Sequence, residues 1–342
     1  RRAKTVLKSM TQLVLAGDVG GTKTWLGLFT CDAPRPVAVA TRRFRTLEHD
    51  GIAAIIARFL EQAGRPQIVA ACLGVAGPVR NNASQLTNVP WRIDGVDLAE
   101  RSGLSTLQVL NDLETMAYAV PWLAPSELAV IQSGTPVKGG TVAVIAPGTG
   151  LGEACLQTVG ECHHALPSEA GHTDFPARTP RELELVASLT ATHGRVALED
   201  VISGPGLVRL HRFTHLTSPC TQGPLPDDPA RQPSAVTASA LNDRCGPCRE
   251  ALDLFVAALG AETGNLALRT LPRAGLYIGG GIGSQIVPAL RSACFLDALS
   301  AKGPMRTLSR STSGTSRRHF SGTILFRIRI HACPKVARNW PR

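Results

Sequence analysis

The first stretch that could do chemistry is GDVGGTKT, residues 17–24, which lies between the apolar runs LVLA and WLGLF. Two adjacent glycines between apolar runs favour a tight hairpin turn. Glycines also let backbone N–H groups approach an anion, and Thr22 and Lys23 add a hydroxyl and a cation that suit phosphate oxygens. The stretch does not fit the P-loop pattern, and no helix follows it. Two interpretations stay open: a hairpin alone, or a hairpin that binds a polyphosphate.

Three more glycine-bearing breaks follow later in the chain. One such break is weak support for a ligand site, but four of them, with polar residues at the ends of predicted strands, carry more weight. The three are formed by Gly148, Thr149 and Gly150, by Gly204, Pro205 and Gly206, and by Gly279, Gly280 and Gly281.

A carboxylate stands at the end of the apolar run LQVLN, where Asn111 is followed by Asp112. Asp112 has a structural explanation, because aspartate is a preferred N-cap and the next segment, LETMAY, has helical character. A carboxylate at a helix N-terminus also stays ionised and aimed outward. A capping role and a chemical role are therefore compatible.

Nine cysteines are scattered along the chain, which does not suggest a disulfide framework. Cys245 and Cys248 form CGPC, which has redox spacing but precedes a long helical run instead of lying in a small βαβ unit. A position in the first helical turn can lower a thiol pKa, yet structural thiols are the favoured interpretation. Zinc is not expected, because no second C-x-x-C pair follows and Cys162, His163 and His164 have no partner at finger spacing. The two histidines are predicted to be surface residues.

The composition is that of a globular protein long enough for two packed domains. The chain has 342 residues, of which 44% are hydrophobic and 18% charged. No apolar stretch approaches the length of a membrane span. The first ten residues, RRAKTVLKSM, are basic but have no apolar h-region, so no signal peptide is predicted and Met10 is an expected start. We expect a cytoplasmic protein.

The net charge of +10 is concentrated at one end of the chain. Ten of the 36 lysines and arginines lie in 301–342, which contains no acidic residue, so the preceding residues hold 26 basic and 26 acidic groups. A neutral body with a basic tail is more typical of a solvated segment than of a surface that reads nucleic acid. A nucleic-acid partner is therefore not expected.

Residues 13–120 alternate short apolar runs with helical patterns, as an α/β layer does. The segment 50–64 has helical periodicity, with Asp50 as the expected N-cap and Gly64 as the expected end. The predicted strands cover 13–19, 25–30, 36–44, 68–77 and 107–111, and further helices are predicted over 96–103 and from Asp112.

A second unit begins near residue 141 with the same form, because TVAVIAPGTGLGEACLQTV contains an apolar strand, a turn rich in glycine and threonine, and another strand. This repetition predicts a duplicated α/β core whose two turns face one cleft. Helices are predicted over 181–194 and 249–271, another follows the proline-rich loop 218–234, and a last strand lies within 274–283.

Past Gly303 the apolar periodicity ends, and only TILFRIRI, residues 323–330, predicts a strand. The abrupt loss of acidic residues motivates the hypothesis of a shifted reading frame or a divergent end. The expected organisation is an N-terminal extension over 1–12, a small α/β domain over 13–120, a large α/β domain over 121–303 and a divergent basic tail over 304–342.

Several stretches in order, from about Leu13 to Lys302, resemble one family of sugar kinases. The chain is similar to the actin, hexokinase and heat-shock ATPase superfamily, and more narrowly to bacterial glucokinases of the enterobacterial, zinc-free type. The resemblance implies two RNase H-like domains that close over ATP. The matching stretches are GDVGGTKT, GVAGPV, TNVPW, LNDLETMAYAVPWL, APGTGLGEA, LPSEAGHTDF, ISGPGLVRL, CGPCREALDLF and YIGGGI.

The resemblance also implies which residues hold the nucleotide. Asp18 is implied to lie near the magnesium ion, and the glycines of the last strand leave room for the nucleoside. The implied phosphate loops are Gly20, Gly21 and Thr22, and Gly148, Thr149 and Gly150, and the adenosine-side glycines are Gly279, Gly280 and Gly281.

The implied sugar site has a base and hydroxyl-binding groups. By resemblance Asp112 is the general base that accepts the proton of the 6-hydroxyl, and Asn111 binds neighbouring hydroxyls. Glu169 and His172 of EAGH, and Glu199 thirty residues after Glu169, are implied to bind further hydroxyls. Carboxylates accept from several hydroxyls at once and imidazole can donate or accept, so the chemistry is suitable. A surface glutamate at 199 and a core histidine at 172 remain the structural alternatives.

The resemblance implies phosphorylation of glucose by ATP with Mg²⁺, which is a step of glycolysis. It implies no membrane partner and is compatible with a homodimer. A kinase for another hexose or an N-acetylhexosamine stays open, as does a catalytically impaired sugar-binding protein with an abnormal C-terminus. A tail that recruits RNA or an anionic surface is a third alternative. The chain lacks the zinc-binding cysteine cluster and the helix-turn-helix of related sugar-responsive repressors.

Overall fold

The computed structural model describes residues 12–32, 35–86, 89–308 and 330–332, which form two compact units. Unit 1 ends at Thr115 and unit 2 begins at Met116, so the division falls inside helix α3 (Asp112–Ala119). The expected boundary at residue 120 lies directly after the same helix. The predicted extension up to residue 11, the first two residues of TNVPW and most of the predicted tail lie outside the described residues.

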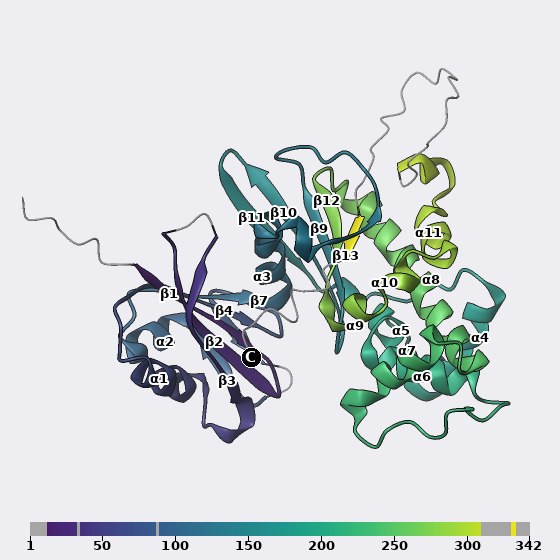
Figure 1. The fold of residues 1–342 in the computed structure, drawn as a ribbon, viewed down its shortest axis with the longest axis horizontal. Coiled ribbons are helices and arrows are strands. Elements are labelled where there is room, and N and C mark those ends of the chain that lie inside the picture. Colours follow the sequence, from purple (N-terminus) through teal and green to yellow (C-terminus); the bar gives the residue numbers. More distant parts are fainter. Residues whose placement is uncertain (1–11, 33–34, 87–88, 309–329, 333–342) are drawn as a thin grey trace, which may run out of the picture. The chain divides into compact units, whose positions relative to one another are not determined.

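Unit 1 is built on a five-stranded sheet in the order β3-β2-β1-β4-β7 (Figure 1). β1 pairs antiparallel with β2 and parallel with β4, and β4 pairs parallel with β7. The first and last predicted strands have the predicted bounds, and the other three differ by at most two residues at either end. The strands are β1 (Leu13–Val19), β2 (Lys23–Thr30), β3 (Val37–Arg45), β4 (Ile68–Val75) and β7 (Leu107–Asn111).

Two helices complete the core of unit 1, α1 (Ile52–Gln62) and α2 (Gly95–Ser102), and the short strands β5 (Ala83–Gln85) and β6 (Arg92–Asp94) pair beside them. The apolar side chains of α1 recur every three or four residues and are buried. The predicted cap of α1 was wrong, because its N-cap is Gly51 and no side chain caps it. In α2 the Asp94 carboxylate does accept hydrogen bonds, from the N–H groups of Val96 and Asp97.

Unit 2 repeats the strand order of unit 1 and adds one edge strand. Its sheet runs β11-β10-β9-β12-β13-β8, with β9 antiparallel to β10 and parallel to β12, and β12 parallel to β13. The first five positions thus match β3-β2-β1-β4-β7 in order and direction, which confirms the predicted duplication. The strands are β8 (Ala129–Gln132), β9 (Val142–Pro147), β10 (Leu151–Val159), β11 (Cys162–Ser168), β12 (Gly275–Ile278) and β13 (Ile330–Ala332).

The fifth position of this repeat is occupied by the predicted tail. β13 shares Ile330 with the predicted strand TILFRIRI, and the rest of that prediction, 323–329, lies outside the described residues. After α11 (Ala293–Ser300), Gly303–Leu308 forms a 3₁₀ helix. Three residues of the predicted tail therefore belong to the sheet of unit 2.

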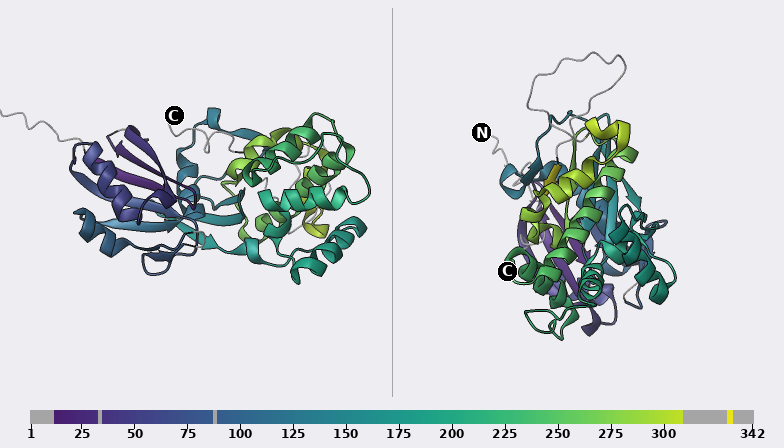
Figure 2. Two further views of the ribbon diagram at one scale, coloured as in Figure 1. Left: turned by 90° about the horizontal axis from the view of Figure 1, so that it is seen from below. Right: turned by 90° about the vertical axis from the view of Figure 1, so that its right-hand side faces the viewer.

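The helices of unit 2 gather beside its sheet around the long helix α8, drawn in green in Figures 1 and 2. α6, α7 and α11 pack against α8, which is long and apolar enough to cross a membrane, but 72% of its most apolar window is buried in this core. α4 and α8 lie where helices were predicted. The helices are α4 (Pro180–His193), α5 (Leu198–Val201), α6 (Gly204–Thr214), α7 (Gln232–Leu241), α8 (Gly246–Thr270), α9 (Gly280–Gln285), α10 (Val287–Leu290) and α11 (Ala293–Ser300).

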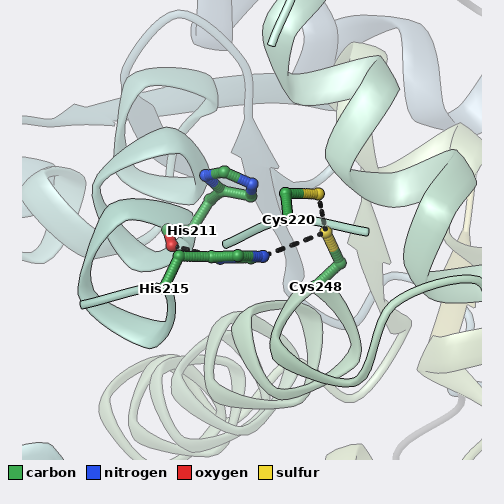
Figure 3. Close-up of side chains that lie close together, drawn as sticks. All are labelled: His211, His215, Cys220 and Cys248. Carbon is green, nitrogen blue, oxygen red and sulfur yellow. Dashed lines mark hydrogen bonds between the residues drawn. The ribbon is translucent and has the colours of Figure 1, made fainter. Parts of the chain in front are cut away.

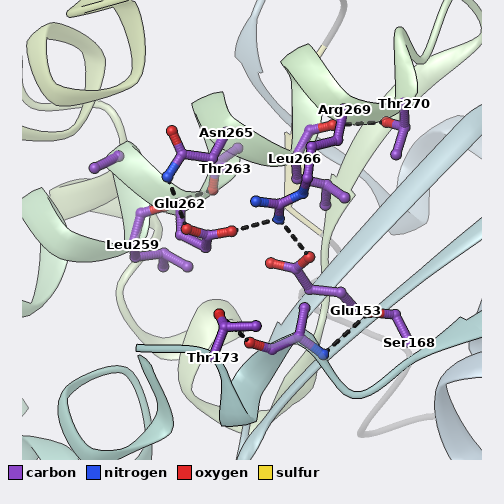
Figure 4. A network of polar contacts seen from close by, with 12 residues as sticks. Glu153, Ser168, Thr173, Leu259, Glu262, Thr263, Asn265, Leu266, Arg269 and Thr270 are labelled. Atoms are coloured by element: carbon purple, nitrogen blue, oxygen red, sulfur yellow. Dashed lines mark hydrogen bonds and ion pairs between the residues drawn. The ribbon is translucent and has the colours of Figure 1, made fainter. Parts of the chain in front are cut away.

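A polar network that contains two buried glutamates joins α8 to the sheet of unit 2 (Figure 4). The Arg269 guanidinium donates to Glu153 Oε2 at 2.9 Å and also to Glu262, and Asn265 donates to Glu262 at 2.9 Å. Glu153 is 1% exposed and its second carboxylate oxygen has no partner. Desolvation and then the charge of Glu262 outweigh the attraction of Arg269 and raise the Glu153 pKa to about 7.

We expect Glu153→Gln to reduce the loss of stability on raising the pH from 5 to 8. The folded state holds the Glu153 proton more tightly than the unfolded state does, so stability is lost as the pH rises through the folded pKa of about 7. The difference amounts to about 2 kcal/mol over this range. Thermal melting at both pH values measures it, with Glu161→Gln, an exposed position, as control. Equal pH slopes in wild type and Glu153→Gln would contradict the assignment.

Candidate active site

The first glycine turn joins β1 to β2 and is clamped from a neighbouring segment. The Gly20 N–H donates to the Lys23 carbonyl at 3.0 Å, which closes the hairpin. Thr46, which is fully buried, donates from its hydroxyl to the Gly20 carbonyl at 2.8 Å and from its N–H to the Thr22 carbonyl at 3.1 Å. Within the described residues, the N–H groups of Gly21 and Thr22 make no hydrogen bond. The hairpin prediction is confirmed, and its tip presents backbone donors suited to an anion.

Asp18 lies at the end of β1, on the edge of the sheet where β4 and β7 also end. The strand register pairs it with Gly74 of β4, and the next position of β4 pairs with Asn111 of β7. The Asp18 side chain is exposed, but the protein around it removes part of its hydration and raises its pKa. Because water still reaches the carboxylate, screening limits that rise. A hard oxygen donor of this kind fits Mg²⁺.

Asn111, and not Asp112, caps helix α3. Asn111 Oδ1 accepts from the Leu113 N–H at 2.9 Å, while Glu114 accepts from the Asn111 N–H at 2.8 Å, which is a capping box. The Asn111 amide also donates to the Gly77 carbonyl at 3.0 Å. Asp112 is the first helical residue, and its Oδ1 accepts from the Leu113 N–H at 2.9 Å. The predicted N-cap role of Asp112 therefore belongs to its neighbour.

The second glycine turn occupies the equivalent position in unit 2, between β9 and β10. The Gly148 N–H donates to the Gly150 carbonyl at 2.8 Å, and Thr149 lies at the tip. The Gly148 carbonyl accepts from the N–H of Gly204, the first residue of α6, at 2.8 Å. The Gly204 to Gly206 motif, at the start of α6, thus holds this turn through a backbone hydrogen bond.

Three predicted sugar-binding side chains come together beside the second turn. Glu199 on α5 and His172, in the 3₁₀ helix Ala170–His172 that follows β11, approach to 3.3 Å between Oε1 and Nδ1. His172 Nε2 lies 3.9 Å from Glu169 Oε2. A Cβ atom on Gly150 would lie 2.7 Å from Glu199 Oε2, so the missing side chain leaves room for this carboxylate. A contiguous set of carboxylate and imidazole groups, of the kind that can bind hydroxyls, therefore adjoins the predicted phosphate loop within unit 2.

The three side chains remain accessible while their backbone is fixed. The side chains of Glu169 and His172 are 59% and 63% exposed, and that of Glu199 is 32% exposed. The Leu198 N–H donates to the Thr173 carbonyl at 2.8 Å, which ties α5 to the 3₁₀ helix. Such a fixed and solvated arrangement can exchange water for the hydroxyls of a ligand.

The three consecutive glycines lie at the same edge of the unit 2 sheet as the second turn. The strand β12 ends at Ile278, and the Gly279 N–H donates to the Ile145 carbonyl of β9 at 2.8 Å. Gly280 has φ of 78°, and a Cβ atom there would lie 2.4 Å from the Pro147 carbonyl. No other residue fits this position without moving the backbone. Gly280 and Gly281 begin α9.

The CGPC pair belongs to the core of unit 2. Cys245 is the N-cap residue of α8, and both thiols are buried. Desolvation raises the pKa of Cys245, but hydrogen bonds from the backbone of Cys248 and Thr221 and from His215 outweigh it and bring the pKa to about 6. Burial raises that of Cys248 to about 12. The predicted surface position of His163 and His164 is confirmed, since both are exposed on β11.

Sequence reasoning missed three residues that lie around this pair. His211 and His215 are on and directly after α6, and Cys220 is in the proline-rich loop. The signal was present in the spacing, because two histidines four residues apart on one helix lie on the same face.

Comparisons with known proteins agree on one family. A family model described as glucokinase matches residues 15–313. A glucokinase of Nostoc punctiforme is 33% identical over 313 residues, which cover 86% of this chain and 92% of that protein. The crystal structure of a glucokinase from an Antarctic psychrotroph is 27% identical, with a TM-score of 0.77 and 94% of each chain covered.

More distant structures share the fold. A ROK family glucokinase from Streptomyces griseus, solved in complex with glucose and AMPPNP, is 18% identical, with a TM-score of 0.58 and 94% of each chain covered. With the repeated five-strand order, this likeness confirms the predicted α/β fold with RNase H-like domains. A family match across most of the chain, supported by a relative that is one-third identical over nearly its full length, establishes that this chain belongs to the glucokinase family.

Proposed function

We propose that this chain transfers the γ-phosphoryl group of MgATP to the 6-hydroxyl of glucose, forming glucose 6-phosphate and ADP. The observation that carries the proposal is the set of Glu169, His172 and Glu199 against the Gly150 turn. Membership of the glucokinase family supports it, as does the glucose and AMPPNP complex of the Streptomyces griseus relative.

The glycine turns are assigned to the nucleotide. In unit 1 the N–H groups of Gly21 and Thr22 are available to phosphate oxygens, and in unit 2 the turn at Thr149 presents an equivalent tip. The absence of side chains at Gly279, Gly280 and Gly281 suits the nucleoside. Asp18 would hold Mg²⁺, which neutralises charge on the phosphates when it is bound. We place the reaction in the cytoplasm.

The sugar is assigned to groups that discriminate by hydrogen bonding. Glu169 and Glu199 accept from hydroxyls, and His172 can donate or accept. A site built to bind a hydroxyl rejects an analogue that lacks it, because the polar groups are then left without a partner. In unit 1 the Asn111 amide has one N–H committed to Gly77, and its second N–H can serve a sugar hydroxyl.

Asp112 is assigned as the general base. The sugar oxygen attacks the γ-phosphorus in line, the new O–P bond forms, and the bond from phosphorus to the β,γ-bridging oxygen breaks with ADP leaving. The proton of the 6-hydroxyl passes to the Asp112 carboxylate. Its place in the first turn of α3 puts this carboxylate beside the positive end of the helix dipole. Phosphoryl transfer asks mainly for this kind of placement.

Replacing Asp112 by Asn should lower kcat roughly 10²- to 10⁴-fold, because the amide cannot accept the proton. The KM for ATP should change little. A coupled assay with glucose and MgATP measures both. Asp97→Asn removes the same charge from an exposed position on α2, where Asp97 pairs with Arg101, and should keep wild-type activity. An Asp112→Asn protein that is folded and fully active would refute the assignment.

Replacing Glu199 by Gln should raise the KM for glucose roughly 10- to 100-fold, because a hydrogen bond to a charged group contributes about 1.5–3 kcal/mol. Steady-state kinetics with glucose and ATP varied in turn separate the two substrates. Glu184→Gln, an exposed site on α4, is the matched control. A change in the KM for ATP alone would assign Glu199 to the nucleotide instead.

A panel of sugars tests the choice of substrate. Glucose should give the highest kcat/KM, ahead of other hexoses and N-acetylhexosamines. A preference for another sugar would keep the kinase assignment and replace glucose. Glucose binding by calorimetry without ADP formation would favour a sugar-binding protein.

A further inference from the structure

Three segments of unit 2 meet around a cluster of histidine and cysteine side chains (Figure 3). The end of α6 is tied to the start of α8 by the Thr214 hydroxyl, which donates to the Pro247 carbonyl at 2.8 Å. The proline-rich loop is tied to the same place by Thr221, whose hydroxyl donates to the Arg244 carbonyl at 2.7 Å. The His/Cys cluster consists of His211, His215, Cys220 and Cys248.

The four side chains have the spacing of a tetrahedral ligand set. One ligand atom from each lies within 4.8 Å of all the others. Cys220 Sγ and Cys248 Sγ are 3.8 Å apart, and Cys248 Sγ lies 3.8 Å from His215 Nε2. Tetrahedral zinc with its usual bond lengths places two sulfurs about 3.8 Å apart and a sulfur and a nitrogen about 3.5 Å apart. The cluster is therefore close to the size that zinc requires.

His215 is held in the orientation of a ligand. Its Nδ1 lies 2.7 Å from the carbonyl oxygen of His211, so that nitrogen carries the proton and donates. Nε2 then has a lone pair and faces the thiols, as Figure 3 shows. Metal-binding histidines commonly donate their other ring N–H to a backbone carbonyl in this way.

The environment of His211 is an independent indication of a metal site. His211 is 8% exposed, it stacks on His215 with ring centroids 3.9 Å apart, and neither of its ring nitrogens has a hydrogen-bond partner. A buried polar atom without a partner is unfavourable, and a metal ion would supply the partner.

We propose that the His/Cys cluster binds one Zn²⁺ through His211, His215, Cys220 and Cys248. Two sulfur and two nitrogen ligands in a tetrahedron are typical of zinc, and four protein ligands make a structural site with no position for substrate. The ion would join the proline-rich loop to the ends of α6 and α8. This proposal is independent of the phosphoryl-transfer site.

Cys245 is the competing fourth ligand. Its sulfur lies 3.4 Å from His215 Nε2 and 3.9 Å from Cys220 Sγ. His211 is preferred because neither of its ring nitrogens has a hydrogen-bond partner, whereas the Cys245 sulfur already has backbone hydrogen bonds from Cys248 and Thr221. A site with Cys245 would have three sulfurs and one nitrogen, so the two sets can be distinguished on the wild-type protein.

The first experiment uses the untagged full chain, purified with a thiol reductant and supplied with Zn²⁺. Elemental analysis should find one zinc per chain after dialysis, and X-ray absorption at the zinc edge should find two sulfur and two nitrogen neighbours. Removal of zinc with a chelator should lower the Tm. A chain that retains no zinc overturns the proposal. A second preparation, made without reductant, tests the thiols: a disulfide at Cys220 that persists when zinc is added also overturns it. Three sulfur neighbours overturn the assignment of His211.

Variants test the ligands one by one. Cys248→Ser and His211→Ala should each lower the zinc affinity at least tenfold, measured against a chromogenic chelator. Cys294→Ser, a half-buried thiol on α11 outside the cluster, should leave it unchanged. Circular dichroism checks that each variant is folded. If a variant does not fold, the X-ray absorption spectrum of the wild-type protein decides whether the ligand set is correct. Full zinc affinity in folded Cys248→Ser would refute the site.

Discussion

Parallel pairing of the central strands is the constraint that places the candidate site residues in each of the two units. In unit 1, β1, β4 and β7 run in the same direction, so the chain leaves all three at one edge of the sheet. Asp18 and Asn111 reach that edge from positions 93 residues apart in the sequence. In unit 2, β9 and β12 do the same for the Gly148 turn and the three glycines. Because parallel strands end at one edge of the sheet, the side chains and turns that follow them lie close together.

The two units hold their glycine turns with hydrogen bonds from different donors. A glycine turn joins β1 to β2 in unit 1 and β9 to β10 in unit 2, and in each the carbonyl of the first turn glycine accepts a hydrogen bond from outside the hairpin. In unit 1 the donor is the buried hydroxyl of Thr46, and in unit 2 it is the N–H at the start of α6. The repeated topology is thus preserved while the residues that hold the turn differ. In each case the supporting donor belongs to the same unit as the turn that it holds.

Much of this architecture could be predicted from the sequence, because apolar runs bounded by glycine leave few alternatives for the strands. The 13–19 and 107–111 strands and the glycine turns were predictable for that reason. The caps were harder. Asp50 and Asp112 are good caps by composition, but Gly51 and Asn111 take those positions, and Asn111 succeeds because Glu114 completes a capping box. The spacing of Asn and Glu was visible in the sequence, and the competition between adjacent caps was not.

The His/Cys cluster shows the limit of spacing arguments more clearly. Its members come from α6, a loop and α8, and only the packing of these segments brings them together. The predicted sugar ligands were easier, because the resemblance to a family supplied positions that composition could not. Within unit 2 they do converge on Gly150, while their roles remain a proposal.

The late position of β13 in the chain has a consequence for biosynthesis. All five strands of the first sheet lie within the first 111 residues, so that sheet can close early as the polypeptide leaves the ribosome. The second sheet cannot: β13 separates β12 from β8, and β8 is translated about 200 residues before its only described neighbour. During that interval the hydrogen-bonding edges of both strands stay open, and open edges are templates for wrong partners. The sheet of unit 2 therefore cannot be completed until residues 330–332 have been synthesised.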